Sequence, residues 1–587
     1  MMKNFLSSLL ATLVGILIMT LVFVLILFGI IAASTSKEVP EVKENSVLLA
    51  KFSAPITDRS DDNPFSRLMT GNPLTDMNMG LDQILKDLKR AKTDDNIRGI
   101  FLNLRAVPSG FTTLSEVRKG LLDFKESGKF IYAYADMYTH TSYYLASVAD
   151  SIFMTPAGVF YFTGLSAEAT FYKKALDKIG VEMQVIKHGS YKSAAEMFTR
   201  EDLSEENREQ IEGYMGAIWE TMVNDIAESR GIEPGTLNQF ADELASLDNQ
   251  KLVESGMIDG LIYYDEMLSL LKEKVGIDES EDLEALQLTR YKDVPVKSKQ
   301  PFSREKIAVI YAMGMVVDGN MGEGYIGSER IARAIRKARR DESVKAIVFR
   351  VNSGGGSVIA SDVIYREAKL AAMEKPFVAS MGDVAASGGY YIVSPADTIV
   401  ASPSTVTGSI GVIFTIPNLK ELLNDKIGIT TDVVKTNRHS DIMSITGPLD
   451  PEERLIIQQT VNDTYDQFVQ LVAENRGMSY EEVDAIAGGH VWSGKDALDL
   501  GLIDMFGGLE ESIGVAASMA GLENYRIESL PRMEDPLTTL IKQFTGDARM
   551  KAIREELGDQ YIHYKNLQDI KTMRGLQSIV PFEIEVH

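Results

Sequence analysis

The sequence predicts an α/β protein made of a tandem duplication behind an N-terminal transmembrane helix. Three observations favour this class: a long uncharged apolar stretch at the N-terminus, β-branched runs that alternate with amphipathic stretches, and a second half that repeats motifs of the first. Alternation of strand and helix patterns predicts mostly parallel sheets with crossover helices. A chain of 587 residues also exceeds one ordinary hydrophobic core.

The first predicted element is a membrane anchor. No charged residue occurs from Asn4 to Ser36, which exceeds the roughly 20 apolar residues needed to cross a bilayer. A cleavable signal peptide has a shorter apolar region of about 7–15 residues, so we expect an uncleaved anchor, although the Ala-Ala-Ser near its end leaves cleavage open. Lys3 precedes the stretch and no basic excess follows it, which favours a cytoplasmic N-terminus and a body outside the cytoplasm.

Two matching repeats follow the anchor. The Tyr-Tyr pair at Tyr143 returns at Tyr390, and "GMIDG" from Gly256 returns as "GLIDM" from Gly501. So long a period indicates a duplicated domain and not a solenoid. The polar, proline-containing stretch between the halves is typical of a linker. We predict a cytoplasmic tip and anchor (1–36), a first repeat (46–290), a linker (291–305), a second repeat (306–520) and a helical tail without a counterpart (521–587).

The repeats differ at one serine. The stretch "VAASGGYYI" of the second repeat contains Ser387, whereas the first repeat has His140 at the same place. A serine in a turn of small residues, just before a helix, has an exposed hydroxyl near the positive end of that helix and suits a nucleophile. The same pattern also fits a plain helix N-cap.

A serine nucleophile needs a base, and none of the six histidines suggests a Ser-His-Asp arrangement. A desolvated lysine is the alternative, because burial lowers its pKa from about 10.4 toward neutrality. The first repeat contains Lys192 in "VIKHGSYKSAAEMF", and the aligned stretch of the second repeat has Ser440 there. A solvated surface lysine is the competing interpretation. Because each repeat keeps what the other lacks, we predict a Ser387–Lys192 dyad that spans both repeats.

Three glycines follow a predicted strand of the second repeat, in "VNSGGGS". Successive glycines let the backbone turn sharply and direct its amides into a cleft, as an oxyanion hole requires, and they also suit an ordinary turn. We assign a possible oxyanion role to the amides of Gly355 and Gly356.

The composition excludes several other kinds of site. The chain has no cysteine, which rules out disulfides, thiolate metal sites and a cysteine nucleophile. The formal net charge of -24 disfavours nucleic acid as a partner. We find no phosphate-binding loop and no metal-ligand cluster in the sequence, so we expect neither a cofactor nor a metal.

The anchor, the tandem repeat and the motifs "MGDVAASGGYYI", "ASPSTVTGSIGV", "GSYKSAAEMF" and "MRGLQSIVPFE" closely resemble the long form of the bacterial signal peptide peptidase A (protease IV) family. The resemblance covers essentially the whole chain. It implies a Clp protease/crotonase-like fold for each repeat, with Ser387 as nucleophile and Lys192 as general base and later acid. The family's loop usually reads Asn-Ser-Pro-Gly-Gly, whereas this chain has Gly354 in place of the proline.

The resemblance further implies a homotetramer in the inner membrane whose catalytic body faces the periplasm and degrades cleaved signal peptides. Two alternatives stay open at this point. In the first, the chain is a catalytically inert membrane scaffold, because His140 and Ser440 show that site residues were lost. In the second, it is a crotonase-like acyl-CoA enzyme. The anchor and the Ser-Lys pair argue against the second of these.

Overall fold

The computed structural model describes residues 11–22, 40–60, 79–295, 303–533 and 575–579. Residues 11–22 form a helix with exposed side chains. Among the described residues, no helix is both long and apolar enough to cross a membrane. Most of the predicted anchor, the middle of the predicted linker and residues 534–574 of the predicted tail lie outside the described residues.

The first repeat is built on a parallel sheet in the order β6-β4-β3-β2-β1-β7. Helices follow most strands, as the alternating pattern predicts. Its sheet and flanking helices are β1 (Ser46–Ala50), α3 (Leu81–Lys92), β2 (Ile97–Asn103), α4 (Phe111–Lys125), β3 (Phe130–Tyr138), α5 (His140–Ala146), β4 (Ser151–Phe160), β6 (Gly260–Leu261), α11 (Tyr264–Val275), β7 (Ala285–Gln287) and α12 (Leu288–Tyr291).

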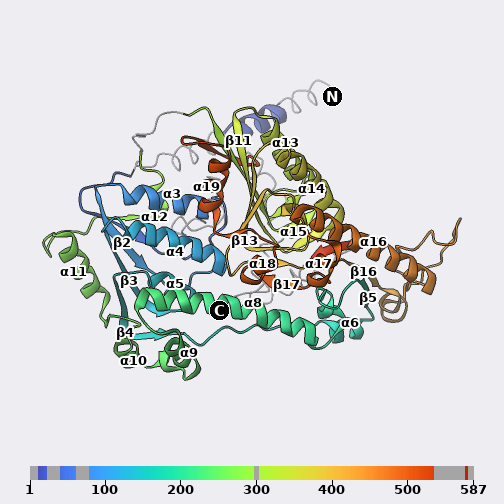
Figure 1. Ribbon diagram of the computed structural model, residues 1–587, viewed down its shortest axis with the longest axis horizontal. Coiled ribbons are helices and arrows are strands. Elements are labelled where there is room, and N and C mark those ends of the chain that lie inside the picture. The colour runs from blue at the N-terminus through green and yellow to red at the C-terminus, as the bar shows by residue number, and fades with distance from the viewer. Residues whose placement is uncertain (1–10, 23–39, 61–78, 296–302, 534–574, 580–587) are drawn as a thin grey trace.

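Residues between β4 and β6 form an excursion from this sheet. Its elements are α6 (Lys173–Ile179), β5 (Glu182–Lys187), α7 (Glu196–Thr199), α8 (Glu205–Arg230), α9 (Pro234–Asp242), η1 (Ala245–Leu247) and α10 (Asn249–Glu254). Figure 1 shows β5 beside the second repeat, far from β2, β3 and β4, with the long helix α8 running between the two sides. This excursion carries part of the first repeat to the second.

The second repeat contains the sheet β17-β15-β13-β11-β8-β19, to which β14 and β18 are attached. β11 is buried along nearly its whole length, as expected for a strand covered by helices on both faces. The elements are β8 (Lys306–Met313), β9 (Met315–Val317), β10 (Tyr325–Gly327), α13 (Ser328–Arg340), β11 (Val344–Ser353), β12 (Gly355–Ser357), α14 (Val358–Ala372), β13 (Phe377–Ala386), α15 (Gly388–Val393), β14 (Thr398–Ala401), β15 (Val406–Gly408), β16 (Ile413–Asn418), η2 (Leu422–Ile427), α16 (Pro451–Arg476), α17 (Tyr480–Ile486), β17 (Val491–Ser493), α18 (Gly494–Asp499), β18 (Met505–Phe506), α19 (Leu509–Met519) and β19 (Arg526–Leu530).

The duplication extends further than the sequence suggested. β19 pairs with β8 in parallel at the sheet edge, just as β7 pairs with β1 in the first repeat. The prediction of a helical tail from residue 521 is therefore wrong for residues 526–530, which form the last strand of the second repeat. Charged residues at alternate positions, Arg526 and Glu528, had hidden this edge strand, in which Leu530 is buried and Ile527 is 45% exposed.

A third sheet joins the two repeats and the end of the chain. Its strand order is β10-β9-β12-β20-β16-β5, in which β5 comes from the first repeat and β20 (Gly575–Ile579) from the C-terminal segment. β5 pairs antiparallel with β16 from Glu182 opposite Asn418 to Lys187 opposite Ile413. The residues that follow β5 are thereby placed against the second repeat.

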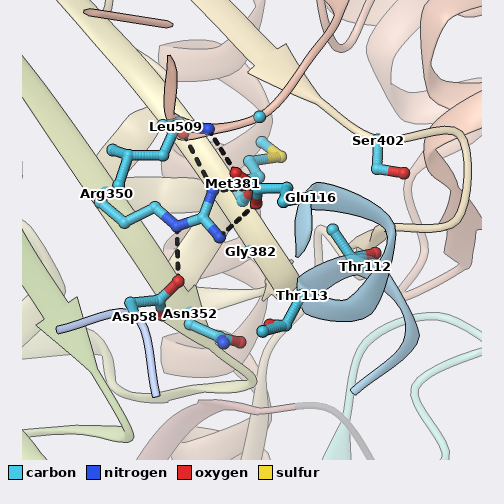
Figure 2. Close-up of polar contacts among 12 residues, drawn as sticks. Asp58, Thr112, Thr113, Glu116, Arg350, Asn352, Met381, Gly382, Ser402 and Leu509 are labelled. Carbon is cyan, nitrogen blue, oxygen red and sulfur yellow. Dashed lines mark hydrogen bonds and ion pairs between the residues drawn. The ribbon is translucent and has the colours of Figure 1, made fainter. Parts of the chain in front are cut away.

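A buried charge cluster fixes the two repeats against each other (Figure 2). Arg350 of β11 is fully buried, and its guanidinium donates to Asp58 at 2.7 Å and to Glu116 at 2.6 Å, both from the first repeat. The other Glu116 oxygen accepts the amide of Leu509 at 2.6 Å. Burial opposes the charge on Arg350, but the two carboxylates outweigh it and raise its pKa.

A second polar contact lies beside this cluster. Asp383 of β13 accepts the amide and the hydroxyl of Thr113, at 3.1 and 2.6 Å, in the first turn of α4. A carboxylate at a helix N-terminus satisfies free amides and favours the helix dipole. Both contacts join the strands of the second repeat to the first repeat and define one relative orientation.

Candidate active site

Ser387 lies between β13 and α15 in a strained backbone conformation. Its φ of 57° and ψ of -117° are unusual for a residue with a side chain. The residue stands at the N-cap position of α15, but its side chain makes no capping hydrogen bond, so the plain N-cap interpretation is wrong. Its amide donates to the Gly408 carbonyl at 2.8 Å. The sharp turn leaves the hydroxyl free to meet other side chains.

The side chain of Lys192 contacts the Ser387 hydroxyl. The Lys192 Nζ lies 2.6 Å from the Ser387 Oγ, and one chain supplies both groups. Lys192 is only 1% exposed, so the interpretation as a solvated surface lysine is wrong. Burial without a neighbouring carboxylate holds the pKa of Lys192 well below its ordinary value.

Ser409 completes the surroundings of the lysine. Its carbonyl accepts from the Lys192 Nζ at 3.0 Å, and its hydroxyl lies 2.9 Å from the same nitrogen. A neutral amine has two N–H donors and one lone pair. If the two donors serve Ser409, the lone pair faces the Ser387 hydroxyl, which is the arrangement a base needs.

Sequence reasoning missed Ser409, although a signal for it existed. The matching residue of the first repeat is Phe162, so the second repeat has a serine here that the first repeat lacks. Ser409 is also held at a positive φ of 50°. Comparing the repeats position by position, and not only at the Tyr-Tyr motif, would have identified it.

The loop that carries Lys192 is anchored at its neighbour, Ser193. The Ser193 hydroxyl lies 2.9 Å from Asn207 Oδ1 and accepts from Gln210 Nε2 at 2.8 Å, both residues of α8. Gln210 also accepts the Val491 amide of β17, at 3.1 Å. A Cβ at Gly489 would lie 2.6 Å from the Lys192 Cβ, so only glycine lets the two loops approach this closely.

Gly355 and Gly356 lie in β12, beside the turn at Ser387. Both have positive φ, 100° and 154°, as glycine allows. The Gly355 amide donates to Ser353 Oγ at 3.1 Å. The Gly388 amide nitrogen lies 2.7 Å from where a Cβ on Gly355 would stand, which adds a third amide to this region. The oxyanion role of Gly355 and Gly356 stays a prediction.

His140 and Ser440 stand at the repeat positions that match Ser387 and Lys192, and each has other surroundings. His140 is buried beside the rings of Phe162 and Trp219, and its Nε2 accepts the Thr163 amide at 2.9 Å. Ser440 lies in an exposed turn, where its hydroxyl donates to the Asn437 carbonyl. The structure thus brings together the predicted serine and lysine, and it separates His140 and Ser440 from them.

Comparison with known proteins places both repeats in one family. A model of peptidase family S49 matches residues 123–278 and 369–523. A protein named Protease 4 from Salmonella typhi is 37% identical over 478 residues, covering 80% of this chain and 76% of the relative. Another Protease 4, from Haemophilus influenzae, is 32% identical and covers 91% of this chain and 89% of its own.

A plant serine protease is also similar to this chain over most of its length. The chloroplastic serine protease SPPA of Arabidopsis thaliana is 31% identical over 533 residues, covering 88% of this chain and 76% of its own. Among solved structures, the match to a ClpP1 mutant from Listeria monocytogenes covers 35% of this chain and 94% of the other, at 16% identity and a TM-score of 0.24. From the family model and the relatives, the chain is a serine peptidase and belongs to peptidase family S49.

Proposed function

We propose that the protein is a membrane-anchored endopeptidase that uses a Ser387–Lys192 dyad to degrade cleaved signal peptides and other unfolded apolar peptides outside the cytoplasm. The observation that carries this proposal is the 2.6 Å contact between Lys192 Nζ and Ser387 Oγ in a buried pocket without a carboxylate partner. The names of the relatives support a peptide substrate.

The proposed reaction needs only these two side chains and backbone amides. Neutral Lys192 accepts the Ser387 proton as the oxygen attacks the peptide carbonyl, and the resulting ammonium gives that proton to the leaving amine. The acyl-enzyme is then hydrolysed by water, with Lys192 again as base. We expect the amides of Gly355, Gly356 and Gly388 to stabilise the oxyanion, and removal of one such donor typically costs about 100- to 1000-fold in rate.

A serine-directed fluorophosphonate tests the dyad directly. Mass spectrometry of the labelled chain is expected to find the adduct on Ser387, with no adduct in Lys192→Arg, because a guanidinium remains protonated at neutral pH. Hydrolysis of casein is measured in the same samples. Absence of both labelling and hydrolysis in the wild-type protein would favour the inert scaffold.

The pH profile reports the state of Lys192. Burial lowers its pKa and the neutral amine is the active form, so kcat/KM is expected to rise with pH through the lowered pKa and then reach a plateau. The plateau should begin well below the ordinary lysine range near about 10.4. Steady-state rates from pH 5 to 10 check this, and a profile that rises only at the ordinary value would contradict it.

The membrane proposal rests on the sequence from Asn4 to Ser36, which carries no charge. The segment is long enough for about one bilayer crossing, and Lys3 before it favours a cytoplasmic N-terminus. An anchor would hold the active site near the bilayer, where apolar signal peptides accumulate. Alkaline extraction of membranes tests it, because the full chain should stay in the pellet and a chain lacking residues 1–36 should not.

We also propose a homotetramer, with repeats contacting head to tail between copies. The counterpart of β5 in the second repeat is residues 430–435, which form no strand, and Val434 there is 97% exposed. The counterpart of β16 in the first repeat, residues 166–171, forms no strand either. Pairing these segments between copies would repeat the β5–β16 contact inside the chain, and a closed ring would leave no segment unpaired.

Light scattering after size exclusion tests this contact. Val434→Asp is expected to convert the tetramer into smaller species, since a carboxylate would be buried without a partner in the pairing. Val363→Asp, at an exposed position of α14, is the matched control and should leave the tetramer intact. A wild-type monomer, or a tetrameric Val434→Asp, would contradict the proposed arrangement.

A further inference from the structure

A closed ring of contacts surrounds the candidate base. Ser193 follows Lys192 in the chain, and its hydroxyl accepts from Gln210 Nε2 of α8 at 2.8 Å. The same nitrogen lies 3.4 Å from the Tyr191 carbonyl, on the other side of the lysine in the chain. Gln210 Oε1 accepts the Val491 amide of β17 at 3.1 Å. One side-chain amide of the first repeat therefore holds both flanks of Lys192 and a strand of the second repeat.

The second repeat closes the ring. Val491 follows His490, whose carbonyl accepts the Ser409 amide at 2.6 Å. The carbonyl and the hydroxyl of Ser409 lie 3.0 and 2.9 Å from Lys192 Nζ. Each step from Lys192 through Gln210 and back to Nζ is thus a covalent bond or a hydrogen bond. Within this ring, Gln210 belongs to neither loop and connects the two from α8.

The hydrogen-bonding direction of Gln210 is fixed from both ends. A backbone amide can only donate, so Val491 faces Oε1 and leaves Nε2 for the lysine loop. At the other end, Glu196 Oε2 accepts from Asn207 Nδ2 at 3.0 Å. Asn207 Oδ1 therefore faces Gln210 Nε2 and the Ser193 hydroxyl, each at 2.9 Å. These four side chains of the first repeat are at least nine-tenths buried, and a buried polar network whose members are satisfied is rigid.

The two repeats differ in this network as they differ in the dyad. α8 and α16 each contain 26 residues and end at a glycine, so Gln210 corresponds to Ile456 and Asn207 to Glu453. Ile456 is 44% exposed, and its side chain forms no hydrogen bond. The loop before α16 carries Ser440 at the position of the lysine. The buried glutamine therefore occurs in the repeat that has the base, and an apolar side chain takes its place in the repeat that has none.

We propose that Gln210 is a positioning residue of the peptidase, which holds the loop of Lys192 and strand β17 in one register and so keeps Nζ within hydrogen-bond distance of Ser387 Oγ. This inference rests on the proposed function of the dyad and adds a residue that touches neither reacting atom. Among the described residues, no carboxylate pairs with the Lys192 amine, so its place depends on its loop and on Ser409. Displacement of a catalytic group by about 1 Å can cost about 100-fold in rate.

Gln210→Met tests this role through the split between kcat and KM. Methionine fills the same space without a donor or an acceptor, so kcat for casein is expected to fall about 100-fold at unchanged KM, because a displaced base affects the chemical step and not substrate binding. Gln184→Met is the matched control. Gln184 of β5 is also buried and also accepts an amide of the second repeat, that of Leu449 at 2.9 Å. Both variants should unfold at a lower temperature, but Gln184→Met should keep the wild-type kcat.

Gln210→Glu separates misplacement from altered protonation. Its carboxylate still accepts the Val491 amide, but once ionised it donates nothing to Ser193. kcat is measured on the high-pH plateau, where Lys192 is neutral, so a loss there does not come from a changed pKa of the lysine. A loss similar to that of Gln210→Met is expected. A wild-type plateau in both folded variants of Gln210, or an equal loss in Gln184→Met, would overturn the proposal.

Crystal structures of the Gln210 variants test the positioning without relying on activity. In Gln210→Met, or in Gln210→Glu if methionine prevents folding, Lys192 Nζ is expected to lie beyond about 3.5 Å from Ser387 Oγ, outside hydrogen-bond distance. An unchanged distance would contradict the role of Gln210 whatever the rates. If the wild-type protein neither hydrolyses casein nor reacts with the fluorophosphonate, the proposed function fails, while the distance still decides whether Gln210 positions the lysine.

Discussion

Lys192→Met is expected to lower kcat/KM by about four orders of magnitude while leaving the protein folded. Methionine has nearly the length of lysine and fills the same buried space, but it accepts no proton from Ser387. The change also removes the cost of burying an amine, so no large loss of stability is expected from the substitution itself. Casein hydrolysis and thermal unfolding of the purified variant provide the two measurements.

Four further variants separate the role of the base from that of its surroundings. Lys192→Arg keeps a cation but should be as inactive as methionine, because guanidinium is not a base at neutral pH. Ser387→Ala should be as inactive as Lys192→Met. The double variant Ser387→Ala/Lys192→Met should lose no more activity than either single variant, since the two residues act as one unit. Lys178→Met, at an exposed position of α6, is the matched control and should retain full activity. Substantial turnover by Lys192→Met would refute the dyad.

The duplication made the central contact predictable. Ser387 and Lys192 are 195 positions apart, and neither stands out in its own segment. Their pairing followed from the comparison of repeats, in which His140 and Ser440 occupy the vacated positions. The parallel sheets were predictable for another reason, because strands that are buried on both faces form continuous apolar runs, such as the one in β11.

Other parts of the site depend on contacts that no local pattern specifies. β20 is a five-residue strand whose partners lie far away in the chain, and register between such distant strands is set by packing. Ser353, which binds the Gly355 amide, looked like one more residue of a glycine-rich loop. The three amides near Ser387 come together only when β12 and α15 pack side by side, so sequence could suggest Gly355 and Gly356 but not Gly388.

The position of Arg350 in the sequence already indicates a buried ion pair. An arginine inside the apolar run "KAIVFRV" has to be either on an exposed face or paired with buried acids. The acids are Asp58 and Glu116, both in the other repeat. The charge of Arg350 is buried in one repeat and neutralised by carboxylates of the other. The relative position of the two repeats therefore contributes to the free energy of folding.

Arg350→Met is therefore expected to destabilise the protein by about 3–5 kcal/mol, since it leaves two carboxylates buried without their cation. The midpoint of urea unfolding measures the loss. Lys495→Met is the matched control, because the exposed Lys495–Glu220 pair also joins the two repeats and exposed pairs contribute little. Equal effects of the two substitutions would show that burial of the cluster is not what stabilises the contact.

The pH dependence of the Arg350→Met deficit follows from the same charges. Burial raises the pKa of Glu116, and Arg350 opposes that effect in the wild-type protein. Without Arg350 the pKa rises further, so the folded variant binds a proton more readily than the unfolded chain, and its stability increases as pH falls. The deficit should accordingly be smaller at pH 5 than at pH 8. A deficit that is constant with pH would mean that lost packing, and not the uncompensated carboxylates, causes the destabilisation.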